Sequence, residues 1–183
     1  MPVYENIPTV DMTFPEGFIR SLHADLNIES MLDVGAGHGG VFDMDYWTTG
    51  PRAANMVERA ACDIHWIRPM PACWATATNV DVHELTDHYS PRHFDLVQCM
   101  EVLEHVNNPR LALEQLIAVA NKVVIFTSCD EWHHQGEEQI AIEQINPHQA
   151  YIKQPSVDDL REFGFNVRVD AGTRRQLIGW NFV

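Results

Sequence analysis

Basic residues are scarce in this chain. Only 12 of its 183 residues are Lys or Arg, against 26 Asp or Glu, so the formal net charge is -14. Such a charge repels the phosphates of nucleic acids and of anionic membrane surfaces, and no local cluster of Lys or Arg offsets it. We therefore expect neither a nucleic acid nor a membrane as a partner.

Cysteine is also sparse, and no segment is apolar for long enough to suggest a membrane span. The four cysteines form no Cys-x-x-Cys pair, which argues against a zinc knuckle and a disulfide framework. The first residues lack the basic and apolar regions of a signal peptide. We expect a soluble, cytoplasmic protein whose 183 residues, 45% of them hydrophobic, form a single domain with one core.

What the sequence does contain is a glycine-dense segment after an apolar run. Met31-Leu32-Asp33-Val34 predicts a strand, and Gly35-Ala36-Gly37-His38-Gly39-Gly40 follows it. Glycine carries no Cβ atom, so the backbone here can approach a ligand closely. The glycines fit both the D-x-G-x-G-x-G loop of methyltransferases and the dinucleotide pattern G-x-G-x-x-G. The segment predicts a nucleotide-type cofactor loop of one of these two kinds.

Strands and helices are expected to alternate along the rest of the chain. Apolar runs between helices are typical of a parallel sheet covered on both faces, and two alternating runs at the end predict an antiparallel pair. Helix starts are predicted at Asn108-Pro109 and at the capping box Ser156-Val157-Asp158-Asp159, with Gly164 ending the second helix. The expected first helix covers 15–26, and the expected strands after the glycine segment cover 59–64, 74–80, 94–99, 122–127, 165–169 and 176–183.

Three segments fall outside this alternation. Residues 1–14 resemble an extended arm, and residues 41–57 predict a short helix followed by an irregular insertion. Residues 128–151 form a polar and aromatic connection too long for a simple turn, which is typical of a substrate loop.

The order of the elements and motifs resembles the class I S-adenosylmethionine-dependent methyltransferases over nearly the whole chain. Besides the glycine segment, Asp63 closes the second strand, Asp81-Val82-His83-Glu84-Leu85 follows the third, and Cys99-Met100-Glu101-Val102-Leu103-Glu104-His105-Val106 follows the fourth. The resemblance implies an α/β, Rossmann-like three-layer sandwich with a seven-stranded, mostly parallel sheet. It also implies in-line transfer of a methyl group from S-adenosylmethionine to an oxygen or nitrogen of a small molecule.

The same resemblance assigns roles to residues around the cofactor. The family's ribose acid corresponds to Asp63, although it lies 30 positions after Asp33, more than the roughly twenty usual in such folds. Glu58 is therefore an alternative ribose acid. The residues implied to bind the cofactor are Asp33, Gly35, Ala36 and Gly37 at the methionine moiety, Asp63 at the ribose, Ile64, Asp81 and Val82 at the adenine, and Cys99 and Met100 near the sulfonium.

Histidine is the natural base for the proton released during methyl transfer. We expect His105 to serve as this base, with His148 as the second candidate. Trp132, His133, His134 and Tyr151 are expected to line the substrate pocket.

A divalent metal is a further candidate ligand. Glu101, Glu104 and His105 form an E-x-x-E-H arrangement that would place all three side chains on one side of a helix. This arrangement resembles the metal site of small-RNA terminal 2′-O-methyltransferases, with His148 or His134 as a further ligand. Because the same spacing also occurs in ordinary buried hydrogen-bond groups, the sequence does not favour a metal.

Two other functions remain open at this point. The G-x-G-x-x-G pattern fits an NAD(P)-dependent oxidoreductase, against which stand the expected helix before the first strand, Asp33, and the terminal antiparallel pair. The chain could also bind S-adenosylmethionine without catalysing transfer, because binding motifs and turnover are separate properties.

Overall fold

The computed structural model describes residues 26–37, 57–65, 76–129, 148, 150–170 and 176–183. The expected arm at 1–14 lies wholly outside these ranges. Most of the expected helix at 15–26, of the insertion at 41–57 and of the loop at 128–151 lies outside them as well. Strand bounds are β1 Ser30–Val34, β2 Glu58–Asp63, β3 Thr76–Asn79, β4 Phe94–Met100, β5 Ala120–Ser128, β6 Asn166–Asp170 and β7 Gln176–Phe182.

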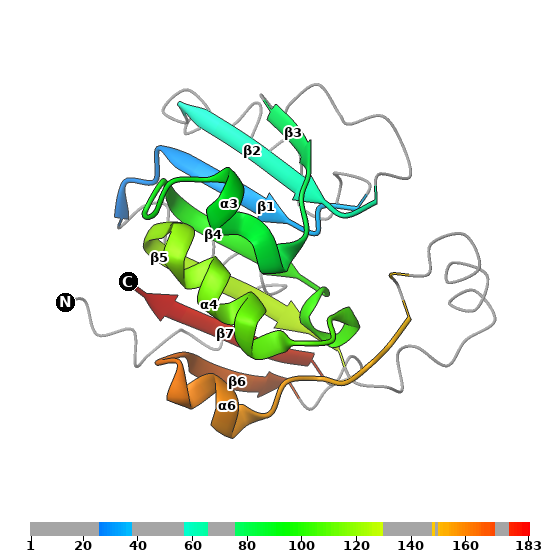
Figure 1. Cartoon of the computed structure of the whole chain (residues 1–183). Helices are drawn as coiled ribbons and strands as arrows, with labels where there is room; N and C mark the ends of the chain where they lie inside the picture. The colour runs from blue at the N-terminus through cyan, green and yellow to red at the C-terminus, as the bar shows by residue number, and fades with distance from the viewer. Residues whose placement is uncertain (1–25, 38–56, 66–75, 130–147, 149, 171–175) are drawn as a thin grey trace.

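These strands form one seven-stranded sheet in the order β3-β2-β1-β4-β5-β7-β6 (Figure 1). Strands β1 to β5 are parallel, whereas β7 runs antiparallel to both β5 and β6. The predicted α/β fold, with a mostly parallel sheet and an antiparallel terminal pair, is therefore confirmed.

The central strands are buried on both faces of the sheet. Met31 and Leu32, whose side chains point to opposite faces, are both fully buried, and every residue of β4 is buried. Such burial explains why these strands are continuous apolar runs in the sequence.

Helices lie at the positions that their capping residues predict. Helix α4 (Pro109–Val119) begins after Asn108, whose side chain accepts the N–H of Leu111 at 3.2 Å. Helix α6 (Val157–Glu162) begins at Ser156 and is followed by Gly164 in the left-handed region, at φ 80°. Short helices are η2 Val82–Glu84, α3 Leu85–His88 and η3 Leu103–His105.

Two sequence expectations need correction. Residues 101–105 do not form one helix, because Glu101 adopts φ 54° and only Leu103–His105 are helical. The left-handed conformation of Glu101 interrupts the chain directly after β4. Helical spacing therefore does not bring Glu101, Glu104 and His105 onto one face. The fifth strand is also longer than the expected 122–127, since β5 pairs with a neighbour along each edge.

None of the helices in the described ranges is long and apolar enough to span a membrane.

Candidate functional site

A pocket opens where β1, β2 and β3 end, at the carboxyl edge of the parallel sheet. This edge is where open α/β sheets place their ligands. Of the residues expected to bind the cofactor, Gly35, Asp63, Ile64, Asp81 and Val82 line the pocket. Both expected histidines, His105 and His148, line it as well.

Asp63 connects the end of β2 to the glycine segment. Its Oδ2 accepts the N–H of Gly37 at 2.7 Å, and its Oδ1 accepts the N–H of His65 at 2.8 Å. Each carboxylate oxygen has a second lone pair for a ligand hydroxyl. Glu58, the alternative ribose acid, lies at the opposite end of β2, where its Oε2 contacts Nε2 of His93 at 2.9 Å. Of the two acids, only Asp63 is placed at the pocket.

The glycine segment turns tightly over the end of β1. Gly35 adopts φ 70° and donates its N–H to the carbonyl of Cys62 at 2.9 Å. A Cβ atom on Gly35 would lie 2.2 Å from Cγ2 of Val102, whereas one on Gly37 would meet nothing within 4 Å. The first glycine is needed for packing, and the second leaves open space beside the backbone.

Asp33 lies beneath this turn and is only 3% exposed. Burial, opposed by the neighbouring Gln98 side chain and supported by the charge of Asp63, raises the pKa of its carboxyl to about 7. Asp33 does not line the pocket, and neither do the other expected residues Ala36, Gly37, Cys99 and Met100.

Apolar side chains form the wall near Asp81. Val80 and Val82 are buried, while Ile64 is 42% exposed although it lines the pocket. An exposed isoleucine beside a carboxylate suits a flat aromatic ring that carries a hydrogen-bond donor.

His105 also lines the pocket, at the end of η3. Its Nδ1 lies 3.2 Å from the carbonyl oxygen of Ala150, which can only accept a hydrogen bond. Nδ1 therefore donates to this oxygen, and in the neutral form of the ring the lone pair is on Nε2. The ring of His148 lies 6.4 Å from that of His65, measured between centroids.

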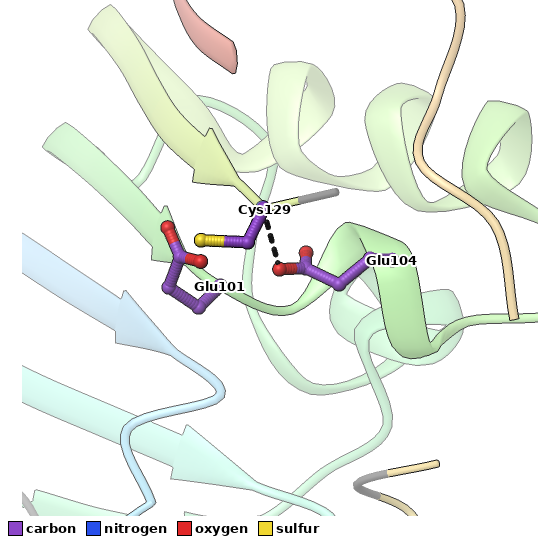
Figure 2. Close-up of side chains that lie close together, drawn as sticks. All are labelled: Glu101, Glu104 and Cys129. Carbon is purple, nitrogen blue, oxygen red and sulfur yellow. Dashed lines mark hydrogen bonds between the residues drawn. The ribbon is translucent and has the colours of Figure 1, made fainter. Parts of the chain in front are cut away.

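Glu101, Glu104 and Cys129 gather at the ends of β4 and β5 (Figure 2). One ligand atom from each lies within 4.8 Å of the others. Glu104 accepts the N–H of Cys129 at 2.8 Å, and burial, together with the charge of Glu101, raises its pKa.

This cluster does not fit the expected metal site. The described residues that gather there are Glu101, Glu104 and Cys129, so the thiol of Cys129 stands where His105 was expected. Mg²⁺ prefers oxygen ligands, whereas the third ligand atom of this cluster is the sulfur of Cys129.

Several residues at the site were not assigned roles from sequence. His83 and Asn107 line the pocket, and Val102 packs against Gly35. The position of Cys129 could have been predicted, because Cys129 follows β5 and Glu101 follows β4, and these parallel strands end at the same edge of the sheet. Among the expected substrate-loop residues, Trp132, His133 and His134 lie outside the described ranges, while Tyr151 accepts the N–H of Gln154 at 3.1 Å.

Comparison with known proteins identifies the family. The methyltransferase domain family matches residues 15–168. No curated protein sequence matches the chain significantly.

Solved structures share the fold at low sequence identity. The trans-methyltransferase CalH in complex with S-adenosylhomocysteine (SAH) is 12% identical, with a TM-score of 0.61, over 91% of this chain and 54% of that one. Magnesium protoporphyrin IX methyltransferase from Synechocystis PCC 6803 with bound SAH is 16% identical, with a TM-score of 0.52, over 91% and 80%. The methyltransferase domain of bacterial CtHen1 is 14% identical, with a TM-score of 0.54, over 91% and 96%. The chain thus spans about half the length of the CalH structure.

The family match covers most of the chain, and the sheet has the seven strands and the antiparallel terminal pair expected from the sequence. The dinucleotide interpretation of the glycine segment is thereby wrong. The chain belongs to the methyltransferase domain family.

Proposed function

We propose that this chain methylates an oxygen or nitrogen atom of a small molecule. The observation that carries the proposal is that one pocket is lined both by Asp63 and Asp81 and by His105 and His148. Acids suited to a nucleoside and bases suited to an acceptor thus meet in one cavity.

In this proposal the chain acts as one domain, with 1–14 as an arm and 128–151 as the substrate loop. The net charge of -14 favours a small molecule over a nucleic acid as the acceptor.

The residues around the pocket fit the cofactor. Asp63 can accept from the ribose hydroxyls, Ile64 and Val82 can pack on the adenine, and the open space at Gly37 admits the methionine moiety. S-adenosylmethionine supplies a methyl group on a positively charged sulfur when bound.

The chain's part in the reaction is to orient the acceptor and remove its proton. As the bond between the methyl carbon and the acceptor atom forms, the carbon–sulfur bond breaks and SAH is left. Nε2 of His105 takes the proton that the acceptor loses, because Nδ1 is held by Ala150. His148 is the second candidate for this role.

The proposal is tested in two steps. Calorimetric titration with SAH and with NADH is expected to show binding of SAH alone, and Asp63→Ala should weaken it about tenfold or more, as expected for lost hydrogen bonds to a charged group. Asp87→Ala, which removes an exposed carboxylate outside the pocket, serves as the control.

Transfer of a labelled methyl group to a panel of hydroxyl and amine compounds then identifies the acceptor. Binding of NADH without SAH would contradict the cofactor assignment. Binding of SAH with methylation confined to carbon or nucleic-acid acceptors would contradict the acceptor class.

A further inference from the structure

His83 lines the pocket next to Asp81, and the proposed reaction leaves it without a role. Its backbone N–H donates to Oδ1 of Asp81 at 2.9 Å. Its ring Nδ1 lies 2.7 Å from the same oxygen. Two groups of one residue therefore hold one oxygen of the carboxylate.

The other ring nitrogen of His83 is anchored to helix α4. Its Nε2 lies 3.1 Å from the backbone carbonyl oxygen of Asn108, the residue that caps this helix. A carbonyl oxygen and a carboxylate oxygen can only accept, so Nε2 and Nδ1 both donate, and the ring that makes both contacts is an imidazolium paired with the Asp81 carboxylate. The same carbonyl also accepts the N–H of Ala112 at 3.1 Å, which places it within the first turn of the helix. The imidazole is thus fixed between the start of α4 and Asp81.

This arrangement decides which oxygen of Asp81 a ligand can use. Oδ1 already has both contacts from His83, whereas no donor to Oδ2 is found in the described part of the chain. The Asp81 side chain remains 33% exposed, and the neighbouring residues Val80 and Val82 are buried and apolar. An acceptor oxygen beside apolar walls fits the exocyclic amino group of a purine.

We propose that His83 is a positioning residue that presents Oδ2 of Asp81 to the 6-amino group of the cofactor's adenine, and thereby selects a 6-amino purine over a 6-oxo purine. This inference rests on the proposed function, since it requires the cofactor in this pocket. A 6-oxo purine offers a carbonyl oxygen in place of the donor, so the carboxylate would face a second acceptor.

The test compares binding of SAH with binding of S-inosylhomocysteine, its 6-oxo analogue, by calorimetry. The wild-type chain should prefer SAH roughly 10- to 100-fold. His83→Ala should reduce this preference about tenfold, because Asp81 loses the ring contact that fixes it. His88→Ala, an exposed histidine on the adjacent helix α3, should leave the preference unchanged.

Two conservative variants separate the two anchors of the ring. An asparagine amide can reach the position of Nδ1, so His83→Asn should restore most of the preference for SAH. Glutamine reaches towards the position of Nε2, so His83→Gln should keep the contact to Asn108 but not the preference. If His83→Ala does not fold, the comparison of His83→Asn with His83→Gln still tests the inference. An equal preference for SAH over the 6-oxo analogue in these two variants would overturn it.

Failure of the inference differs from failure of the proposed function. If His83→Ala weakens both ligands equally, His83 has only a structural role. A wild-type chain that binds SAH without preferring it to the 6-oxo analogue would equally overturn the role of Asp81. A wild-type chain that does not bind SAH at all contradicts the proposed function itself.

Discussion

The N–H of Gly37 donates a hydrogen bond to Oδ2 of Asp63, the last residue of the neighbouring strand β2, at 2.7 Å. The bond joins the turn that follows β1 to the acid that closes β2, across 26 residues of sequence. The glycine segment is therefore held from two sides, because Gly35 is bonded separately to the carbonyl of Cys62.

This bond predicts how the segment responds when Asp63 is replaced. In Asp63→Ala the amide hydrogen of Gly37 should exchange with solvent about 10- to 100-fold faster, as expected for a lost hydrogen bond to a charged acceptor. The amide of Gly35 provides the internal control, because its bond to Cys62 remains. Hydrogen exchange followed by NMR measures both. Equal acceleration at the two glycines would mean that the whole turn opens and that Asp63 does not hold Gly37 specifically.

Alanine should have unequal effects at these two glycines. Gly35→Ala combines a left-handed backbone with a Cβ atom 2.2 Å from Val102, so we expect a loss of about 3 kcal/mol in the free energy of unfolding. Gly37→Ala carries only the backbone strain, about 1 kcal/mol, because nothing lies within 4 Å of its Cβ position. Urea unfolding measures both losses. Val102→Ala should recover part of the loss in Gly35→Ala, and similar losses at both glycines would contradict the packing argument.

Asp33 predicts a proton-linked step in cofactor binding. Burial raises its pKa to about 7, so below that pH the carboxyl of the ligand-free protein holds a proton. If the cofactor's ammonium group binds this carboxylate, binding should release close to one proton at about pH 6 and almost none at about pH 9. Affinity should then rise up to about tenfold per pH unit below pH 7.

Calorimetry of SAH binding in buffers with different ionisation enthalpies counts the released protons. Asp33→Asn should remove the release at low pH. Tight binding without proton release in the wild-type chain would show that Asp33 stays protonated beneath the turn and does not contact the ammonium group.

The sequence was sufficient for the fold because local signals agreed with tertiary packing. Strands such as Phe94–Met100 are apolar throughout and are buried on both faces. The helix starts at Asn108 and Ser156 have side chains that cap the backbone, and Gly164 has the left-handed conformation that ends α6. Acids at the ends of parallel strands could be placed for the same reason, since those ends meet at one edge.

The contacts around the site could not be predicted in the same way. The left-handed turn at Glu101 has no sequence signal, because glutamate rarely adopts it, and it changes which side chains meet. Cys129 lies beside Glu104 only because β4 and β5 are parallel neighbours in a particular register. His83 likewise receives its role from Asn108, which is 25 residues away in sequence.

Because the pKa of Glu104 is raised in the folded chain, we expect the chain to lose stability as the pH rises. Burial and the charge of Glu101 raise its pKa from 4.5 to about 8, so the folded chain holds a proton that the unfolded chain releases above pH 4.5. The free energy of unfolding should therefore fall between about pH 5 and pH 8, by up to about 1.4 kcal/mol per unit. Glu104→Gln removes this titration and can keep the acceptor for the Cys129 N–H, so its stability relative to wild type should rise over that range.

Chemical unfolding at a series of pH values measures this difference. Glu104→Ala is the matched control, because it also removes the titration but leaves the buried N–H of Cys129 without its acceptor. It should be less stable than Glu104→Gln by about 1–3 kcal/mol at every pH. A constant difference between wild type and Glu104→Gln would show that Glu104 is ionised in the folded chain.

Replacing His105 is expected to impair catalysis while leaving cofactor binding nearly unchanged. Its Nδ1 is bonded to Ala150, so Nε2 is the atom that can accept the proton of the methyl acceptor. With the acceptor found by the labelling screen, His105→Ala should lower kcat about 10²- to 10⁴-fold, the range typical of a lost general base. The dissociation constant of SAH should change little, and His88→Ala should leave both quantities unchanged. A comparable loss in His148→Ala, with His105→Ala remaining active, would assign the base to His148, because both histidines line the pocket.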